Sequence, residues 1–475
     1  MNAGNNVFHR GAVSLAIPLA AVFLFCGQAL AGFKERVFET RLSNGLTVLL
    51  LEDHKVPLVS VQVWYRTGSR NEEFGKTGIS HLLEHMMFKG TRKISADAFN
   101  RMIQENGGQE NAFTSEDYTA YFENLASDRI GVPLTIESDR LHNLVLREKD
   151  FRTERMVVME ERRMRTDDNP QAYLLEQLNA AAFQSQPYHW PIVGWMDDIA
   201  RITLQDLKAY YRSRYSPGNA ILVVVGDFRR EKLLPQIERF FGRIAKGKTP
   251  AVVHYNDPPQ TGERRIVVNR EAQAPALVVG YHVPNLSNPD AYVLEVVSAI
   301  LSGGKSSRLY VDLVEEKQLA MDVDADNPLL NVDPGLFMVS AAVLPGKSAS
   351  ETEKALGDQM ERLRQEPVDA NELEKAKNQL EAAFVFQQDS FFAQGLLLAR
   401  YEIALNWSAA DDYIPSIRKV TAEDILRVAR STFTPDKRTI GILNPIPPEP
   451  GKTPPSGMPL KENVIRKAEI SHAHD

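Results

Sequence analysis

Two histidines and a glutamate lie close together in the chain, at His81, Glu84 and His85. The stretch from Ile79 to Gly90 has the apolar spacing of an amphipathic helix. Histidines four positions apart project from one face of a helix, where both imidazoles can bind one Zn²⁺. Glu84 lies on the same side, where a carboxylate can take a proton from a water on the metal. The segment predicts a zinc site with its own general base, and an accidental match among helix-surface residues is the alternative.

A second predicted helix, residues 151–165, carries the candidate for a third ligand. One stripe of it combines five residues at helical spacing: Glu154, Val157, Val158, Glu161 and Met164. Carboxylates within an apolar stripe need a partner, which a divalent metal and the groups around it would supply. Glu160 points about 100° away from this stripe and is expected to face solvent. Salt bridges from the stripe glutamates to nearby arginines are the alternative reading.

These residues resemble the inverted-zincin peptidases of the pitrilysin family, M16, which includes insulin-degrading enzyme and the mitochondrial processing peptidase. The order H-x-x-E-H at residues 81–85 is the zinc motif of that family. A second glutamate follows about 75 residues later in the family, and Glu161 lies 76 positions after His85. The resemblance implies that His81, His85 and Glu161 bind one Zn²⁺ per chain. It also implies that Glu84 is the catalytic base and that Glu154 supports catalysis without binding the metal.

Residues 107–121 are similar to a strand that the family uses as an edge for pairing with a substrate peptide. The resemblance therefore assigns substrate binding to Asn111, Ala112 and Phe113. Shorter similarities occur at residues 42–48, 64–72 and 88–91, so the resemblance covers most of the chain.

The resemblance also implies an arginine and a tyrosine, seven positions apart in the second half, that hold the substrate and its developing oxyanion. Val314 and Met321 occupy those positions here, and neither can donate a hydrogen bond. Losing one such donor can cost roughly 3–4 kcal/mol of transition-state stabilisation. We therefore expect a heterodimer in which a paralogous M16 subunit without H-x-x-E-H supplies the Arg and the Tyr. The alternative is that Arg308 or Tyr310 acts locally.

The composition is that of an ordinary globular protein, with 475 residues, 43% hydrophobic, 25% charged and a net charge of −7. No basic block indicates nucleic-acid binding, and no stretch after the first 31 residues is apolar enough to cross a bilayer. Arg10, the apolar residues 12–26 and the small-x-small residues 29–31 predict a secretory signal peptide. A retained membrane anchor is the alternative.

The expected location is the periplasm, or the outside, of a Gram-negative bacterium. Cys26 is the only cysteine, so the mature chain would form no disulfide and would tolerate an oxidising compartment.

Strand patterns occur at residues 37–41, 46–51, 58–64, 111–122 and 219–226, and helical patterns at 78–88, 96–106, 129–144, 170–185 and 203–214. Because strands and helices do not alternate strictly, an α+β fold is expected. A linker-like stretch, residues 246–262, precedes a second module with strands at 265–269 and 276–282 and a helix at 291–302. That order copies the first module without the metal-binding residues.

The resemblance then implies two homologous domains, each an antiparallel sheet packed with helices. The predicted boundaries are a signal peptide at 1–31, a catalytic zinc-binding domain at 32–250, an inactive domain at 263–445 and a flexible tail at 446–475.

The function that follows is a zinc-dependent endopeptidase acting on peptides or unfolded polypeptides, as the zinc-bearing subunit of a two-component complex. A non-catalytic zinc-binding scaffold, a hydrolase of other substrates and a chaperone-like periplasmic protein with structural zinc are the alternatives. Structural zinc sites are mostly built from cysteine, which the mature chain would lack.

Overall fold

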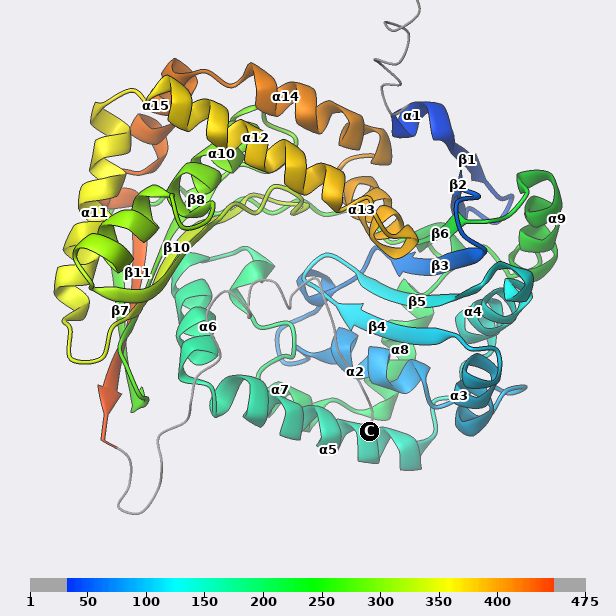
Figure 1. Ribbon diagram of the computed structural model, residues 1–475. Helices are drawn as coiled ribbons and strands as arrows, with labels where there is room; N and C mark the ends of the chain where they lie inside the picture. The colour runs from blue at the N-terminus through cyan, green and yellow to red at the C-terminus, as the bar shows by residue number, and fades with distance from the viewer. Residues whose placement is uncertain (1–31, 448–475) are drawn as a thin grey trace, which may run out of the picture.

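Two β-sheets, one in each half of the chain, form the framework of the protein (Figure 1). The structure is a computed structural model, and it describes residues 32–447. The first sheet has six strands in the order β1-β2-β6-β3-β5-β4: β1 Val37–Arg41, β2 Thr47–Glu52, β3 Leu58–Tyr65, β4 Gln109–Thr114, β5 Thr119–Ala126 and β6 Ala220–Gly226. The second has five in the order β7-β11-β8-β10-β9: β7 Arg264–Glu271, β8 Ala276–Val283, β9 Ala320–Asp326, β10 Gly335–Val343 and β11 Arg438–Ile446.

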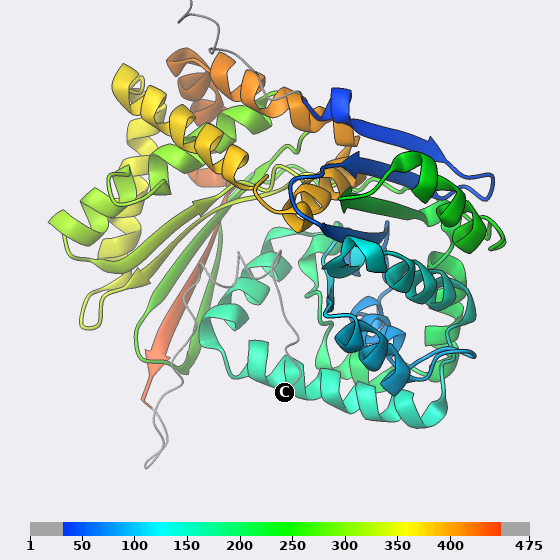
Figure 2. The same ribbon diagram turned by 45° about the vertical axis from the view of Figure 1, so that its right-hand side comes forward.

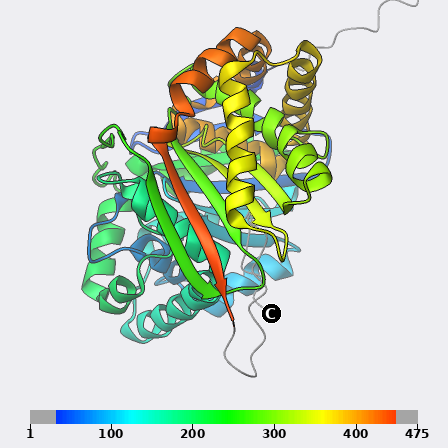
Figure 3. The same ribbon diagram turned by 90° about the vertical axis from the view of Figure 1, so that its left-hand side faces the viewer.

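The two sheets share one topology. Without β1, the first sheet reads β2-β6-β3-β5-β4, and β7-β11-β8-β10-β9 repeats that order strand for strand. The prediction of two homologous α+β domains is confirmed. Each sheet is mixed rather than wholly antiparallel, because the last strand of each half returns parallel to an early one, β6 to β2 and β11 to β7. Figure 3 shows β11 between β7 and β8, with α11 crossing the same sheet.

The helices agree with the sequence patterns to within a few residues where a pattern was identified. Those of the first half are α1 Phe33–Arg36, α2 Ile79–Met87, α3 Ala96–Glu105, α4 Gly131–Asn143, α5 Glu148–Arg162, α6 Pro170–Ala182, α7 Met196–Arg201, α8 Leu204–Arg214 and α9 Arg230–Phe241. Those of the second half are α10 Asp290–Ser302, α11 Ala349–Gln365, α12 Ala370–Phe386, α13 Phe391–Ala404, α14 Tyr413–Lys419 and α15 Ala422–Thr432.

The predicted strand at 111–122 is a hairpin instead of one strand. β4 ends at Thr114 and β5 begins at Thr119. Between them the Ser115 hydroxyl accepts hydrogen bonds from the main-chain N–H groups of Asp117 and Tyr118, at 3.1 and 3.2 Å. A serine that bonds the main chain a few residues ahead favours a turn over a continuous strand. The prediction of a single strand was wrong for this reason.

Each half contributes a helix to the sheet of the other half. α6 of the first half packs on β7, β8 and β11, and α13 of the second half packs on β3 and β6. Figures 1 and 2 show α6 lying against the second sheet. Gly395 allows the close approach of α13, because a Cβ at that position would collide with the amide of Gln62 on β3. Each half of the chain therefore packs against the sheet of the other half. The predicted boundary near residues 250–263 divides the sequence between the two sheets, but α6 and α13 each pack across it.

The signal peptide predicted for residues 1–31 and most of the tail predicted for 446–475 lie outside the described residues. Within residues 32–447 no helix is long and apolar enough to span a membrane.

Candidate metal centre

Helix α2 carries three of the predicted site residues and is buried along its whole length. Its leucines and methionines, including Leu82 and Met86, belong to the core of the first half. The helix starts after Gly78, which has a left-handed φ of 88°, and a Cβ there would collide with the carbonyl of Val193. The Glu72 carboxylate accepts hydrogen bonds from the first N–H groups of the helix, those of Gly78 and Ser80, at 2.7 and 2.8 Å. Because these groups have no partner within a helix, Glu72 fixes where α2 begins.

The three predicted ligands come together between α2 and α5. His81 Nε2 lies 3.7 Å from Glu161 Oε1, and His85 Nε2 lies 3.3 Å from Glu161 Oε2. One potential ligand atom of each residue lies within 4.8 Å of those of the other two, and all three side chains are buried. Two imidazoles and one carboxylate form a donor set of catalytic zinc sites, which leave a position for water. The three residues thus fit a zinc ion, and no second group of three such donors occurs within residues 32–447.

Glu84 is fully buried beside these residues. Its Oε2 accepts a hydrogen bond from the hydroxyl of Thr114, the last residue of β4. Burial raises the pKa of Glu84 to about 7, although the charge of His85 and the Thr114 bond act in the opposite direction. A carboxyl with a pKa near neutrality can both accept and return a proton.

Glu154 lies behind His85, where it contacts the imidazole nitrogen that does not face Glu161. Its Oε2 is 3.3 Å from His85 Nδ1, and its Oε1 is 2.8 Å from Lys89 Nζ. Burial would raise the pKa of Glu154, but the hydrogen bonds from His85 and Lys89 outweigh it and lower the pKa. A carboxylate in this position fixes the tautomer and ring orientation of a metal-binding histidine. The placement supports the predicted role of Glu154 as an auxiliary residue.

Glu161 is held as a carboxylate. Burial would raise its pKa, but the charge of His81, the hydrogen bond with His85 and the charge of Arg165 keep the pKa well below the usual range. Arg165 Nη1 lies 2.8 Å from Glu161 Oε1, and its side chain is 45% exposed. Arg165 belongs to the π-helical segment η3, Arg163–Asp167, which continues α5. The Glu161–Arg165 pair is a salt bridge of the kind that the alternative interpretation of the stripe expected, and it occurs together with the histidine contacts. The sequence did not predict the role of Lys89, which is four residues from His85.

The stripe predicted on α5 is only partly buried. Glu154, Val158 and Glu161 are buried, as expected, and the side chain of Glu160 is exposed beside Arg163. Val157 and Met164 are 41% and 62% exposed, so their expected place in the buried stripe was wrong. Both lie at the margin of the stripe, where the burial pattern shows that no neighbouring element covers the helix.

The three residues assigned to substrate binding lie on β4, at the end of the strand order of the first sheet. Asn111 and Phe113 are half-buried and Ala112 is buried. β4 pairs with β5 on one side, and no described strand pairs with its other side. An edge strand of this kind can add a peptide through main-chain hydrogen bonds. Because Thr114 binds Glu84, this edge ends at the predicted base.

Val314 and Met321 stand in the second half where the resemblance implies an arginine and a tyrosine. Val314 packs against the second-half core, and Met321 is 50% exposed on β9. Arg308 donates two hydrogen bonds to Glu372, from Nε at 2.8 Å and from Nη2 at 2.6 Å, and its buried Nη1 has no hydrogen-bond partner among the described residues. Tyr310, the other alternative donor, is the first residue of η6 (Tyr310–Glu316).

Replacement of Glu154 by Gln is expected to weaken zinc binding by roughly 10–100-fold, because His85 loses the carboxylate that orients it. Competition with a chromogenic chelator would measure the affinity. Glu160→Gln is the matched control on the same helix, since Glu160 faces solvent and binds Arg163. Equal zinc affinities for the two variants would contradict a supporting role for Glu154.

Family models and known proteins match both halves of this chain. The family model for insulinase, peptidase family M16, matches residues 47–194, and the model for the peptidase M16 inactive domain matches residues 201–380. The zinc protease PqqE of Helicobacter pylori is 33% identical over 408 residues, covering 85% of this chain and 92% of that protein. The uncharacterized zinc protease YmxG of Bacillus subtilis is 27% identical over 395 residues, covering 83% and 95%. The crystal structure of a protease from Helicobacter pylori superposes with a TM-score of 0.83 at 33% identity, covering 86% of this chain and all of that one.

Proposed function

This chain belongs to the M16 peptidase family, and on that basis we propose that it is a zinc-dependent endopeptidase of peptides or unfolded polypeptides. One observation carries the proposal. His81, His85 and Glu161 converge beside Glu84, and Glu84 is hydrogen-bonded to the last residue of an open edge strand. A peptide paired with β4 would therefore bring its main chain to the base. Relatives named zinc proteases over most of this chain support the same activity.

In the proposed reaction His81, His85 and Glu161 hold one zinc ion, which when bound polarises a carbonyl and lowers the pKa of a water toward ~7. Glu84 takes the proton of the attacking water while the new oxygen–carbon bond forms and the carbonyl electron pair moves to its oxygen. The carbon–nitrogen bond then breaks, and Glu84 returns the proton to the leaving amine. Glu154 keeps His85 oriented, and main-chain pairing along β4 makes recognition tolerant of sequence.

We propose that the chain works in the periplasm or outside the cell as the zinc-bearing subunit of a heterodimer. Val314 and Met321 leave the oxyanion without the donors expected from the second half, so a paralogous M16 chain would supply them. The family membership and the zinc-ligand set support the zinc-bearing role for this chain. A zinc-binding scaffold without activity is the second candidate, favoured by the same two residues.

The test is cleavage of an unstructured fluorogenic peptide by the zinc-loaded chain, alone and with its paralogue. We expect slow turnover alone, faster turnover with the paralogue, loss of activity with a chelator, and recovery on adding zinc. Zinc at one ion per chain with no cleavage in either mixture would instead favour the scaffold. Strong activity of the chain alone would contradict the need for a partner.

Zinc affinity is expected to rise with pH until about pH 9. Burial would lower the pKa of His85, but hydrogen bonds to Glu154 and Glu161 outweigh it and raise the pKa to about 9 in the metal-free protein. Zinc binds neutral imidazole, so it must displace this proton, and the affinity should change about tenfold per pH unit. The proton also stabilises the metal-free fold below the unfolded pKa, and that contribution is lost as the pH rises through about 9.

Calorimetric titration with zinc in two buffers of different ionisation enthalpy would count the protons released. Release of about one proton per zinc at pH 7 is expected. An affinity that is the same at pH 6.5 and pH 8 would contradict the raised pKa of His85.

A further inference from the structure

The segment that leads from β3 to α2 makes three contacts that the proposed reaction does not use. Arg66 Nη2 binds Glu402 Oε1 of α13 at 2.6 Å. Glu72 holds the start of α2. Between them, Arg70 is buried with two carboxylates, those of Asp117 and Asp333. The segment therefore joins the zinc helix to the second half of the chain.

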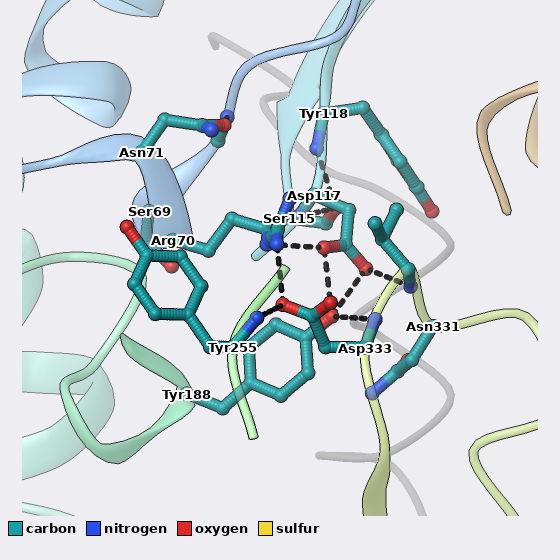
Figure 4. Close-up of polar contacts among 12 residues, drawn as sticks. Ser69, Arg70, Asn71, Ser115, Asp117, Tyr118, Tyr188, Tyr255, Asn331 and Asp333 are labelled. Atoms are coloured by element: carbon teal, nitrogen blue, oxygen red, sulfur yellow. Dashed lines mark hydrogen bonds and ion pairs between the residues drawn. The ribbon is translucent and has the colours of Figure 1, made fainter. Parts of the chain in front are cut away.

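The buried group around Arg70 is a dense polar cluster (Figure 4). Arg70 Nε lies 3.3 Å from Asp117 Oδ1, and Arg70 Nη2 donates to Asp333 Oδ2. The Tyr188 hydroxyl donates to both oxygens of Asp117, at 2.7 and 2.9 Å, and accepts the Asp333 N–H at 3.2 Å. The N–H of Tyr255 donates to Asp333 Oδ2 at 3.2 Å.

Charge and burial make this cluster sensitive to the loss of any member. Arg70, Asp117 and Asp333 are 5%, 7% and 1% exposed, so one guanidinium is shared by two carboxylates with little help from water. Loss of Arg70 would leave two buried carboxylates without a cation, and loss of either carboxylate would remove one of the two ion pairs through which Arg70 holds these segments together. The relative positions of the segments that carry these residues are therefore tightly set.

Each charged member belongs to a different functional segment. Arg70 is in η1 (Ser69–Asn71), two residues before the glutamate that holds α2. Asp117 is in the turn that ends β4, and its Oδ2 also accepts the N–H of Val332 from the second half at 3.1 Å. Asp333 lies in the second-half loop just before β10. The cluster is where the approach to the zinc helix, the turn of the substrate edge and the second half meet.

We propose that Arg70 and Asp333 are positioning residues through which the second half sets the placement of β4 relative to α2. This inference rests on the proposed function, because that placement decides whether a peptide on β4 lies over Glu84. A misplacement of about 1 Å far from the reacting atoms can cost a hundredfold in rate. The second half thus helps to position the site, although none of the three predicted zinc ligands belongs to it.

Asp333→Asn is the direct test, and Glu402→Gln is its matched control. Both variants turn a carboxylate in an ion pair between the halves into an amide, but the Arg66–Glu402 pair does not contact the β4–β5 turn. Peptide affinity would be measured by calorimetry on zinc-loaded protein that also carries Glu84→Gln, and kcat/KM on protein with Glu84 intact. For Asp333→Asn we expect about a tenfold loss in both quantities at one zinc per chain, and for Glu402→Gln a change within about twofold.

Hydrogen exchange on the metal-free protein gives a readout that needs neither zinc nor cleavage. Asp333→Asn should speed exchange in residues 109–126 and 72–82, and Glu402→Gln should not. If the wild-type protein binds no peptide, the proposed function fails, and this exchange pattern still decides whether the cluster positions the two elements.

Tyr188→Phe is the second test variant, for use if Asp333→Asn does not fold. It removes the hydroxyl that links Asp117 to Asp333 but changes no charge. A loss of peptide affinity of roughly threefold, with faster exchange in the same residues, would support the inference. Unchanged affinity and exchange in Asp333→Asn or Tyr188→Phe, or equal losses in Asp333→Asn and Glu402→Gln, would overturn it.

Discussion

Replacement of Glu84 by Gln is expected to lower kcat for peptide cleavage by roughly 10²–10⁴-fold while the protein keeps its zinc. Glutamine has the shape of glutamate and can still accept the Thr114 hydrogen bond, but its amide cannot take a proton from water. Glu84 is not among the three ligands, so the metal site should survive the change. Turnover under saturating peptide and metal analysis of the same preparation would measure both effects.

Glu160→Gln is the control for this change, because it makes the same chemical replacement on the exposed face of α5. It should leave turnover and zinc content close to wild type. A Glu84→Gln protein that keeps more than about a tenth of wild-type turnover would remove Glu84 from the role of base.

Replacement of Glu161 by Gln is expected to weaken zinc binding by about 100-fold or more. An amide oxygen carries no charge, and structural zinc sites with four ligands bind with ~10–16 kcal/mol, so one ligand contributes roughly 3 kcal/mol. Because metal that binds only the native state stabilises it, the rise in Tm that zinc gives the wild-type protein should largely disappear. Chelator competition and thermal unfolding with and without zinc would measure the two quantities.

Arg163→Gln is a useful comparison for Glu161→Gln, since Arg163 lies two residues away and binds exposed Glu160 instead of the site. It should keep wild-type zinc affinity. If Glu161→Gln bound zinc as tightly as Arg163→Gln does, the third ligand would have to be another residue.

Local periodicity was sufficient to predict the two helices that carry the site residues. The helical spacing of His81, Glu84 and His85 predicts α2, and that of Glu154, Val158 and Glu161 predicts one face of α5. The distance between the two helices in the chain does not predict that they pack together, and the resemblance to a family supplied that step. The repeated order of elements in the second half was likewise visible only weakly, whereas the strand orders make it plain.

The sequence was less informative about features that depend on tertiary packing, such as which helix residues are buried and where a strand ends. Val157 and Met164 have the spacing of buried residues, but spacing does not reveal which side of a stripe a neighbour covers. The Ser115–Tyr118 turn depends on one hydroxyl that bonds the main chain, within a stretch of otherwise favourable strand residues. The exchange of α6 and α13 between the sheets follows from the fit of whole surfaces.

Charged groups around the site were missed for a related reason. Lys89 has the character of an ordinary surface residue, and only the fold brings it to Glu154. Arg165 reaches Glu161 by local helical spacing, but nothing in the sequence distinguishes it from the other arginines nearby. Asp333 reaches Arg70 from a position 263 residues away in the sequence, a separation at which no local pattern operates. His81 and His85 could be proposed from their types and spacing, and the resemblance to a family selected Glu161. The residues that hold these ligands in place could not be predicted.

The central claim is that two imidazoles and the Glu161 carboxylate bind one zinc ion, and crystallography with anomalous scattering at the zinc edge tests it most directly. We expect a single peak per chain, about 2.0–2.2 Å from a nitrogen of His81, a nitrogen of His85 and an oxygen of Glu161. Zinc-supplemented crystals without a peak there, or with a peak whose protein ligands exclude Glu161, would contradict the account.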